Sequence, residues 1–409
     1  MRILVITQYY YPEQFRVNDI CETLAKRGHT VTVVTGLPNY PEGEIYEEYK
    51  DSYSEEEFIN GVRILRCNLR PRHIGSINLI RNYISFVHQS KKLLKRINEV
   101  YDVVYVYEIS PVTVGIPAIY YKKHHRIPIY LYCLDIWPEC VRDRGEKEPL
   151  NKRHPVYVVA LMLSKYVYKH VDEIGIKCIQ FSDYLQKVCK VPKNKMKLLY
   201  EHAEQSYLEV AEEAQQNGCY DFMFLGNIGS SQKCETIIKA LEGIDETVPF
   251  KLHFVGSGSE LENLKRFVNN HKLESKVIFH GRHPLSEIND YYDFADCCVM
   301  NLTCKTAVGY TLTAKLTSYM AASRPIIAAA EGATKDIIES ADCGICVDSD
   351  NEEQLRAAMV EVLKNQSVFR DKGKKGRKYF LEHFTIDQHV GELENQLLHL
   401  VENHLVENR

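Results

Sequence analysis

Residues 220–233 read YDFMFLGNIGSSQK, a short hydrophobic run that ends in a turn of small and polar residues. The run has the length and aromatic content of a buried β-strand, and a helical pattern follows the turn. The same alternation is repeated downstream, where each new strand begins with FKLHFVG, KVIFHG, DCCVMNL, RPIIAAA or CGICVD. Strands that alternate with helices in this way predict parallel βαβ units, and therefore a doubly wound α/β domain.

The first half of the chain contains a second, independent series of the same kind: RILVIT, HTVTVVT, VRILRC, DVVYVY and IPIYLY. A chain of 409 residues also exceeds the usual size of a single core. We therefore expect two Rossmann-like domains, at 1–200 and 218–385, joined by a polar and acidic linker at 201–217. An amphipathic helix at 386–409 could pack on either domain.

Composition excludes several classes of protein. The 51 basic and 55 acidic residues give no overall field that would attract nucleic acid. Of the thirteen cysteines, only Cys343 and Cys346 have CxxC spacing, and without a second such pair we expect reduced thiols and not a zinc or redox centre. No stretch approaches the ~20 apolar residues that span a bilayer. We expect a cytoplasmic protein that is soluble or attached peripherally to the inner face of the cell membrane.

The turns that follow strands are the expected ligand sites, because open parallel sheets bind ligands beyond the carboxyl ends of their strands. Two such sheets facing each other would share a site in the cleft between them. In the turn 226–233, backbone N–H groups, a helix N-terminus and Lys233 could hold a diphosphate. The alternative is an ordinary βα turn, where Gly and Ser are common. The glycine turn at 256–260 has Leu261 in place of a third glycine, which makes an NAD-dependent oxidoreductase the least favoured class.

Seven motifs occur in an order that resembles the family 4 glycosyltransferases of the GT-B fold, and among them the bacterial surface-polysaccharide and colanic-acid enzymes. They are QYYYPE, GLPNYPEG, LDIWPE, FLGNIGSSQK, FVGSGSE, FHGRHPLSEI and AKLTSYMAASRPII, and they span essentially the whole chain. The resemblance implies retaining transfer of a hexosyl or N-acetylhexosaminyl group from a nucleotide-sugar, with UDP favoured. The implied acceptor is a polyprenyl-diphosphate-linked or other glycan of surface or capsular polysaccharide synthesis. No cofactor or metal is expected, because lysines and helix dipoles can neutralise the leaving diphosphate.

The resemblance also assigns donor-binding residues. Lys233 matches the family's phosphate-binding lysine, whereas Asn227 replaces a common arginine. Two glutamates of the family are replaced by Tyr310 and Ser318; Ser318 could still bind ribose, and Lys315 on the same helix could balance the diphosphate charge. Arg282 lies on the loop against the nucleotide base, with simple surface exposure as the alternative. The full set is Gly226, Asn227, Gly229, Lys233, Gly256, Gly258, Arg282, Tyr310, Thr311, Lys315 and Ser318.

Asp135 and Glu139 in LDIWPE are the candidate catalytic residues of the first domain. A carboxylate there could serve as a base or orient the acceptor, although Asp135 could instead cap the next helix. In the front-face reaction typical of retaining relatives, the donor phosphate itself can accept the proton. Arg16, after the first strand, is a candidate phosphate contact. Asp348-Ser349-Asp350 is interpreted as a turn and helix cap and not as a metal site.

The stretch 61–100 is strongly basic and includes an apolar stripe. Its nine basic side chains face one acid, Glu99; they are Arg63, Arg66, Arg70, Arg72, Arg81, Lys91, Lys92, Lys95 and Arg96. Helical spacing aligns Ile77, Ile80, Ile84 and Val87, which could lie on an anionic membrane and present a lipid-linked acceptor. The alternative is that the stripe packs on the sheet and the charges form a solvated face. Nucleic acid is not expected, since no basic groove interleaved with aromatic residues accompanies the patch.

Two other functions remain open from the sequence. The replacements at Asn227, Tyr310 and Ser318 would also suit a non-catalytic partner protein that has kept the GT-B fold. A nucleotide-sugar epimerase could be built on the same two-domain plan, and it would need acidic and histidine groups in its site.

Overall fold

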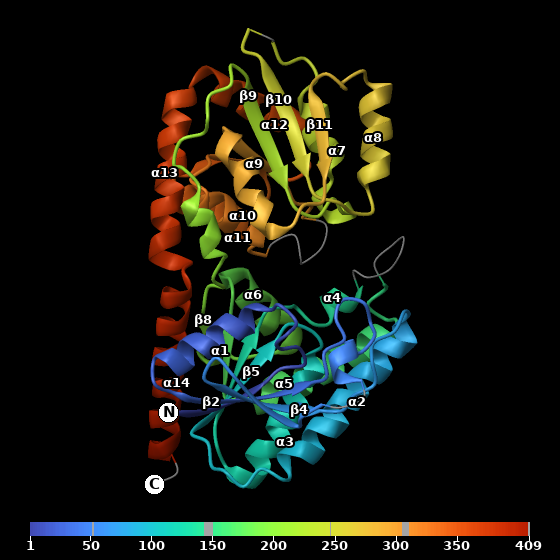
Figure 1. Cartoon of the computed structure of the whole chain (residues 1–409), viewed down its shortest axis with the longest axis vertical. Coiled ribbons are helices and arrows are strands. Elements are labelled where there is room, and N and C mark those ends of the chain that lie inside the picture. The colour runs from blue at the N-terminus through green and yellow to red at the C-terminus, as the bar shows by residue number, and fades with distance from the viewer. Residues whose placement is uncertain (51–52, 143–149, 246, 305–310, 408–409) are drawn as a thin grey trace. The chain divides into compact units, whose positions relative to one another are not determined.

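The computed structural model describes residues 1–50, 53–142, 150–245, 247–304 and 311–407, which form two α/β units (Figure 1). The first unit combines Met1–Glu201 with Ile386–Arg409, and the second is His202–Thr385. The C-terminal helix therefore belongs to the first unit. The segment 202–217, expected as a linker, is included in the second.

The first unit contains an eight-stranded sheet with the order β3-β4-β2-β1-β5-β6-β7-β8. Every pair is parallel except β3 with β4, which is antiparallel. The strand order reverses between β1 and β5, which is where open α/β sheets commonly bind ligands. The strands are β1 (Arg2–Ile6), β2 (Thr30–Gly36), β3 (Glu56–Ile59), β4 (Val62–Cys67), β5 (Val103–Glu108), β6 (Ile129–Cys133), β7 (Glu173–Ile176) and β8 (Met196–Leu198).

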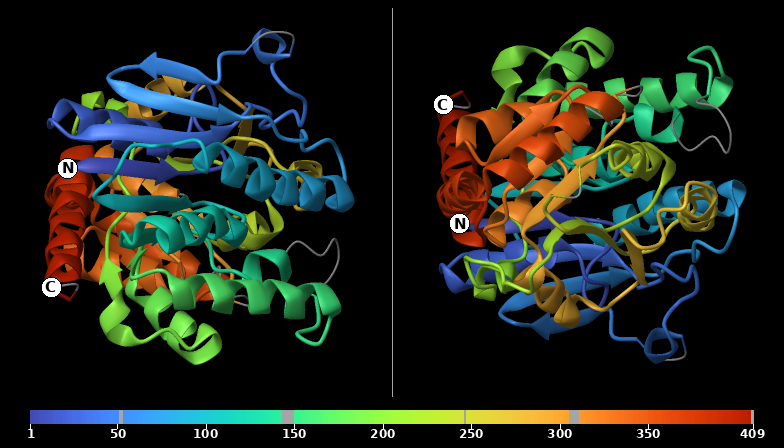
Figure 2. Two further views of the ribbon diagram at one scale, coloured as in Figure 1. Left: turned by 90° about the horizontal axis from the view of Figure 1, so that it is seen from below. Right: turned by 90° about the horizontal axis from the view of Figure 1, so that it is seen from above.

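Helices cover both faces of this sheet. On one face, α1 (Arg16–Lys26) and α14 (Ile386–Glu407) share a core with the strands, and the stripe Val390, Leu393 and Leu397 is fully buried there. The hydrophobic pattern of the C-terminal helix is thus explained by packing within the first unit. On the other face, α2 (Ser76–Leu94), α3 (Gly115–His125) and α5 (Pro155–His170) run side by side (Figure 2, left). The short helices α4 (Glu139–Arg142) and α6 (Ile179–Tyr184) complete the unit.

The second unit contains a six-stranded sheet of order β11-β10-β9-β12-β13-β14, and all its pairs are parallel. This is the Rossmann order, with its reversal between β9 and β12. The predicted doubly wound α/β architecture is confirmed in both units. The strands are β9 (Tyr220–Leu225), β10 (Phe250–Val255), β11 (Val277–Gly281), β12 (Cys297–Asn301), β13 (Ile326–Ala329) and β14 (Gly344–Val347).

One face of the second sheet packs on α7 (Cys234–Ala240), α8 (Leu261–Asn270) and α12 (Glu352–Lys364), which bury aliphatic residues against Phe222 and Phe254. The remaining helices are α9 (Ile288–Phe294), α10 (Ala314–Ala321), α11 (Ala333–Ala341) and α13 (Gln366–His383). Buried Arg324 explains why the segment 202–217 joins this unit. Its Nη1 and Nη2 donate to the carbonyl oxygens of Glu212 and Ala211 at 2.9 and 2.8 Å.

Candidate functional site

The turn after β9 lies where the strand order of the second sheet reverses, and Lys315 of α10 packs against it. Gly226 has φ +127°, and a Cβ there would lie 2.9 Å from Lys315 Cε. The Lys315 ammonium donates to Gln232 Oε1 at 3.0 Å and lies 4.7 Å from the ring centroid of Phe224. Burial lowers the pKa of Lys315 to about 8. A lysine with little solvation therefore lies beside the glycine turn.

The second glycine turn supports the first through backbone packing. A Cβ at Gly256 would lie 1.9 Å from the carbonyl oxygen of Gly226, and a Cβ at Gly258 would lie 2.3 Å from that of Ile228. The Ile228 N–H also donates to the carbonyl oxygen of Ser257 at 2.9 Å. These glycines let two turns stack. At Gly229, by contrast, a Cβ would meet only the side-chain amide of Asn227, at 2.7 Å.

Lys233, at the end of the turn, is held by a carboxylate. Its Nζ lies 2.7 Å from Oδ2 of Asp350, which follows β14 and has φ +61°. Asn301 Nδ2 and Thr303 Oγ1, at and after the end of β12, each donate to Asp350 at 3.0 Å. Burial acts to raise the pKa of Asp350, but the hydrogen bonds from these three side chains leave it below its usual value. Asp350 is thus a charged partner of Lys233.

The interpretation of Asp348-Ser349-Asp350 as a helix cap was wrong. The cap of α12 is Asn351, whose side chain accepts from the N–H of Gln354 at 3.0 Å. Asp348 instead accepts from Gln354 Nε2 at 2.9 Å, and Asp350 is directed to Lys233. Within the described ranges, no group of three or more His, Cys, Asp or Glu side chains is arranged to hold a metal ion.

The other donor-site candidates differ in their surroundings. Asn227 and Arg282 are exposed, on the loops after β9 and β11, and Thr311 is buried. Ser318 Oγ donates to the carbonyl oxygen of Ala314 at 2.9 Å, so its own helix already uses the hydroxyl hydrogen. Tyr310 lies outside the described residues.

In the first unit, Asp135 follows β6 and is half-buried, beside a second carboxyl group that the sequence analysis missed. Glu108 ends the neighbouring strand β5, is fully buried, and accepts from the Tyr168 hydroxyl at 3.3 Å on each oxygen. Burial raises the pKa of Glu108 well above its usual value, and the charge of Asp135 raises it further. Only its position at the end of a strand could have suggested this residue from sequence.

Glu139 is 1% exposed and its carboxylate is fully engaged. The hydroxyls of Tyr157 and Tyr184 donate to Oε1 at 2.9 and 2.6 Å, and Arg142 Nη1 donates to Oε2 at 2.9 Å. Burial acts to raise its pKa, but these hydrogen bonds outweigh burial and lower it. We therefore assign Glu139 a structural role in joining α4 to α5 and keep Asp135 as the catalytic candidate.

The motifs QYYYPE and GLPNYPEG are joined by Glu13, a buried residue that the sequence analysis did not select. Its Oε1 accepts from the N–H groups of Asn39 and Tyr40 at 2.8 and 2.7 Å, and burial raises its pKa to about 7. Arg16, at the start of α1, has its Nη1 3.3 Å from Oε1 of Glu201. Its charge is therefore already balanced within the first unit.

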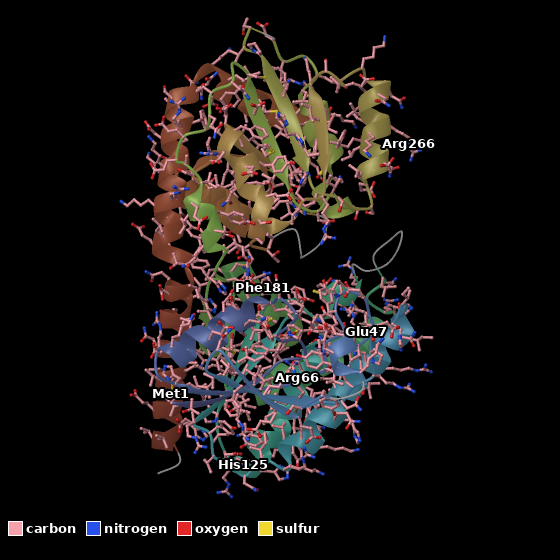
Figure 3. All side chains as sticks on the ribbon, viewed as in Figure 1. Met1, Glu47, Arg66, His125, Phe181 and Arg266 are labelled. Atoms are coloured by element: carbon pink, nitrogen blue, oxygen red, sulfur yellow. The ribbon has the colours of Figure 1, made fainter. Side chains whose placement is uncertain are left out.

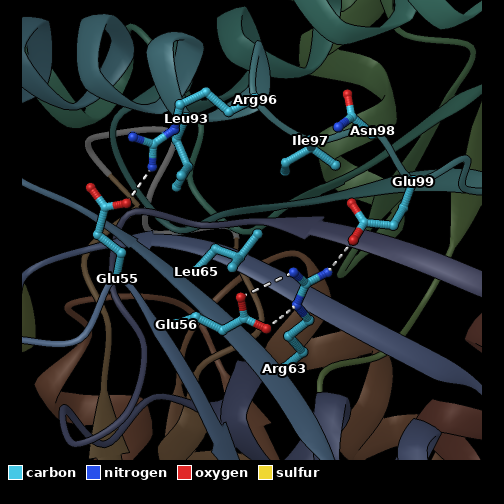
Figure 4. Close-up of a pocket in the computed structure, with 9 residues that line it drawn as sticks. All are labelled: Glu55, Glu56, Arg63, Leu65, Leu93, Arg96, Ile97, Asn98 and Glu99. Atoms are coloured by element: carbon cyan, nitrogen blue, oxygen red, sulfur yellow. Dashed lines mark hydrogen bonds and ion pairs between the residues drawn. The ribbon is translucent and has the colours of Figure 1, made fainter.

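The basic stretch is partly neutralised by acids that lie outside or at the end of it. Arg66 is buried inside the first unit (Figure 3) and donates to Glu57 at 2.8 Å. Arg63 donates to Glu56 and Glu99, while Arg96 pairs with Glu55 (Figure 4). A pocket of about 270 Å³ lies among the pairs of Arg63 and Arg96, and its charged groups bind one another. Arg70, Arg81, Lys92 and Lys95 remain exposed.

The isoleucines of the α2 stripe do not pack on the sheet, so this part of the alternative was wrong, whereas Val87 is half-buried. Ile77, Ile80 and Ile84 are 69%, 48% and 65% exposed. A different face of the helix, which includes Tyr83 and Phe86, is buried instead. Helix α5 on the same side of the sheet also exposes apolar residues: Val158, Val159 and Met162. No helix among the described residues is long and apolar enough to cross a membrane.

Known structures define the class of this fold. Sucrose-phosphate synthase from Thermosynechococcus elongatus superimposes with a TM-score of 0.72 at 18% identity, covering 97% of this chain and 99% of that one. HepE from Anabaena, solved in complex with UDP, superimposes with a TM-score of 0.69 at 12% identity and the same coverage. The protein therefore has the GT-B fold.

Residues 209–379 match the family described as glycosyl transferases group 1. An uncharacterized glycosyltransferase from Methanocaldococcus jannaschii is 22% identical over 217 residues, which are 53% of this chain and 57% of that protein. The chain spans about half the length of the curated relatives it matches. The chain is thus similar to the group 1 glycosyl transferases over residues 209–379, which lie within the second unit.

Proposed function

We propose that the protein is a retaining glycosyltransferase that binds a nucleotide-sugar, most simply a UDP-sugar, at the turn after β9. The observation that carries this proposal is the presence of two lysines, Lys233 and Lys315, at this turn where the strand order reverses. Two cations at a glycine turn suit a diphosphate. UDP in the solved structure of HepE supports the choice of nucleotide.

In the proposed reaction, the lysines stabilise the negative charge that develops on the leaving diphosphate. Lys315 is suited to this because a poorly solvated ammonium interacts more strongly with a nearby anion than an exposed one does. Helix α7 has only seven residues, so the lysines carry more of this role than its dipole. Asp135 would orient the acceptor hydroxyl, and the donor phosphate would take its proton.

We further propose a lipid-linked glycan acceptor at an anionic membrane surface. The supporting observation is the exposed stripe of Ile77, Ile80 and Ile84, flanked by exposed basic residues that include Arg70 and Arg81. Apolar side chains with basic neighbours are typical of helices that lie on membranes. Each basic residue near an anionic surface contributes about 1 kcal/mol.

Titration calorimetry with UDP, GDP and NAD tests the donor site, using the wild type, Lys233→Ala and Lys315→Met. Lys239→Ala is a matched control, because this lysine of α7 pairs with Glu235. We expect one nucleoside diphosphate to bind, with loss of affinity in the first two variants only. Binding without sugar transfer to any acceptor would favour the non-catalytic alternative, and interconversion of free UDP-sugars would identify an epimerase.

Sedimentation with vesicles tests the membrane surface. We expect binding to anionic vesicles that weakens at high salt and is lost in Ile77→Ser/Ile84→Ser. Val406→Ser in α14 removes an equally exposed apolar side chain elsewhere and should have no effect. Equal binding of the double variant and the wild type would reject this surface.

A further inference from the structure

Asp350 occupies an unusual position beside the proposed donor site. It has a left-handed backbone conformation, with φ +61°, which is uncommon for residues other than glycine and is best tolerated by Asn and Asp. Its carboxylate lies between the loops that follow β9, β12 and β14, and it is the ion-pair partner of Lys233. None of the functions proposed above uses this carboxylate.

We propose that Asp350 is a carboxylate latch that competes with the nucleoside diphosphate for Lys233 and promotes release of the diphosphate product. This inference rests on the proposed donor site. A diphosphate that binds Lys233 must either displace Asp350 from the ammonium or remain close to its negative charge. Both outcomes weaken diphosphate binding, because like charges at short range repel each other.

The hydrogen bonds of Asp350 explain how the carboxylate would stay in place when Lys233 leaves. Asn301 Nδ2 donates to Oδ1 and Thr303 Oγ1 donates to Oδ2, so each carboxylate oxygen keeps one partner. The Asp350 N–H also donates to Asn301 Oδ1 at 3.1 Å. Lys233 is the more exposed member of the pair, with 36% of its side chain exposed against 19% for Asp350, and its four-carbon stem allows the ammonium to change partners. The latch is therefore fixed, and the lysine moves between two anions.

The direct test is Asp350→Asn in the full chain, with UDP as the probe. Asparagine has almost the same shape, tolerates φ > 0 and retains an acceptor oxygen, but it removes the charge. We expect UDP to bind about two- to tenfold more tightly, the range for losing one partly exposed ion-pair competitor. Slower dissociation should account for most of the gain. Asp348→Asn is the matched control, because this exposed aspartate lies in the same loop but accepts from Gln354 of α12 and not from a lysine.

A double-mutant cycle identifies the partner. In the Lys233→Ala background, Asp350→Asn should no longer tighten UDP binding. Unchanged or weaker binding by Asp350→Asn in the wild-type background would overturn the latch, while binding that depends on Lys233 would leave the donor site intact. Failure of the wild type and of Asp350→Asn to bind any nucleotide would reject the donor site and the latch together. If Asp350→Asn does not fold, Asp350→Gly suits the same φ and gives the same test.

Discussion

The strongest quantitative prediction concerns the pH dependence of nucleotide binding through Lys315. Burial lowers the pKa of this lysine to about 8, whereas a bound diphosphate would favour its charged form and raise its pKa. Below pH 8 most of the free protein already has a protonated Lys315, so the ligand binds without uptake of a proton at this residue. Above pH 8 the ligand must bind together with a proton. Affinity should therefore fall by about tenfold per pH unit above pH 8.

Calorimetry in two buffers of different ionisation enthalpy measures the number of protons taken up. At pH 8, Lys315 is about half protonated in the free protein, so binding of UDP should take up about half a proton. Uptake at this residue should approach zero near pH 6. The variant Lys315→Met is similar in length but cannot titrate, and it should bind more weakly with no uptake from this position. Equal proton uptake by the wild type and Lys315→Met at pH 8 would refute the assignment.

Three further predictions follow from burial and backbone geometry. Burial raises the pKa of Glu13 from 4.5 to about 7. The folded protein therefore holds this proton more tightly than the unfolded chain does, and the free energy of unfolding should fall by about 3 kcal/mol as pH rises from 4.5 to 7. In Glu13→Gln, the free energy of unfolding measured in urea should depend less on pH. Gly226→Ala should abolish nucleotide binding in calorimetry, because its Cβ would displace the lysine of α10, whereas Gly229→Ala should weaken binding less, because only the side-chain amide of Asn227 has to move. Leu397→Ala should lower the free energy of unfolding by about 2–5 kcal/mol, and the half-exposed neighbour Leu398 should be far less sensitive.

The parallel strands and most helices could be predicted because their signals are local. A strand such as 220–225 is hydrophobic at every position except Asp221, since both of its faces are buried, and a turn and a helix follow it. Strand β3 escaped prediction for the opposite reason. It is an antiparallel edge strand of sequence EEFI whose residues are exposed or half-buried, so no hydrophobic run marks it.

Charge counting along the sequence failed where partners come from a neighbouring strand. In the sequence, the basic residues of β4 have no acidic residues close by within 61–98. The antiparallel pairing of β4 with β3 nevertheless brings Glu56 to Arg63 and Glu57 to Arg66. Helix α2 shows a related limit. Helical spacing identifies an apolar stripe, but it does not tell which of two apolar faces meets the sheet. Here the aromatic face is buried and the isoleucine face is exposed.

In the candidate donor site, the sequence marks the positions where backbone geometry requires glycine, but it does not mark the residue that neutralises a lysine. Glycines at 226, 256 and 258 are required because backbone or a lysine fills the space of a Cβ. Asp350 cannot be recognised in this way from the sequence, yet its carboxylate neutralises the charge of Lys233. With Lys233 paired to Asp350 and Lys315 partly deprotonated near pH 8, two cations at one turn need not repel each other before the ligand arrives. The two lysines would engage the ligand by different routes: Lys233 exchanges one anion for another, and Lys315 takes up a proton. Asp350→Asn leaves Lys233 without its anionic partner and should therefore lower the pKa of Lys315 further, so the effects of this substitution and of pH on UDP affinity should be coupled.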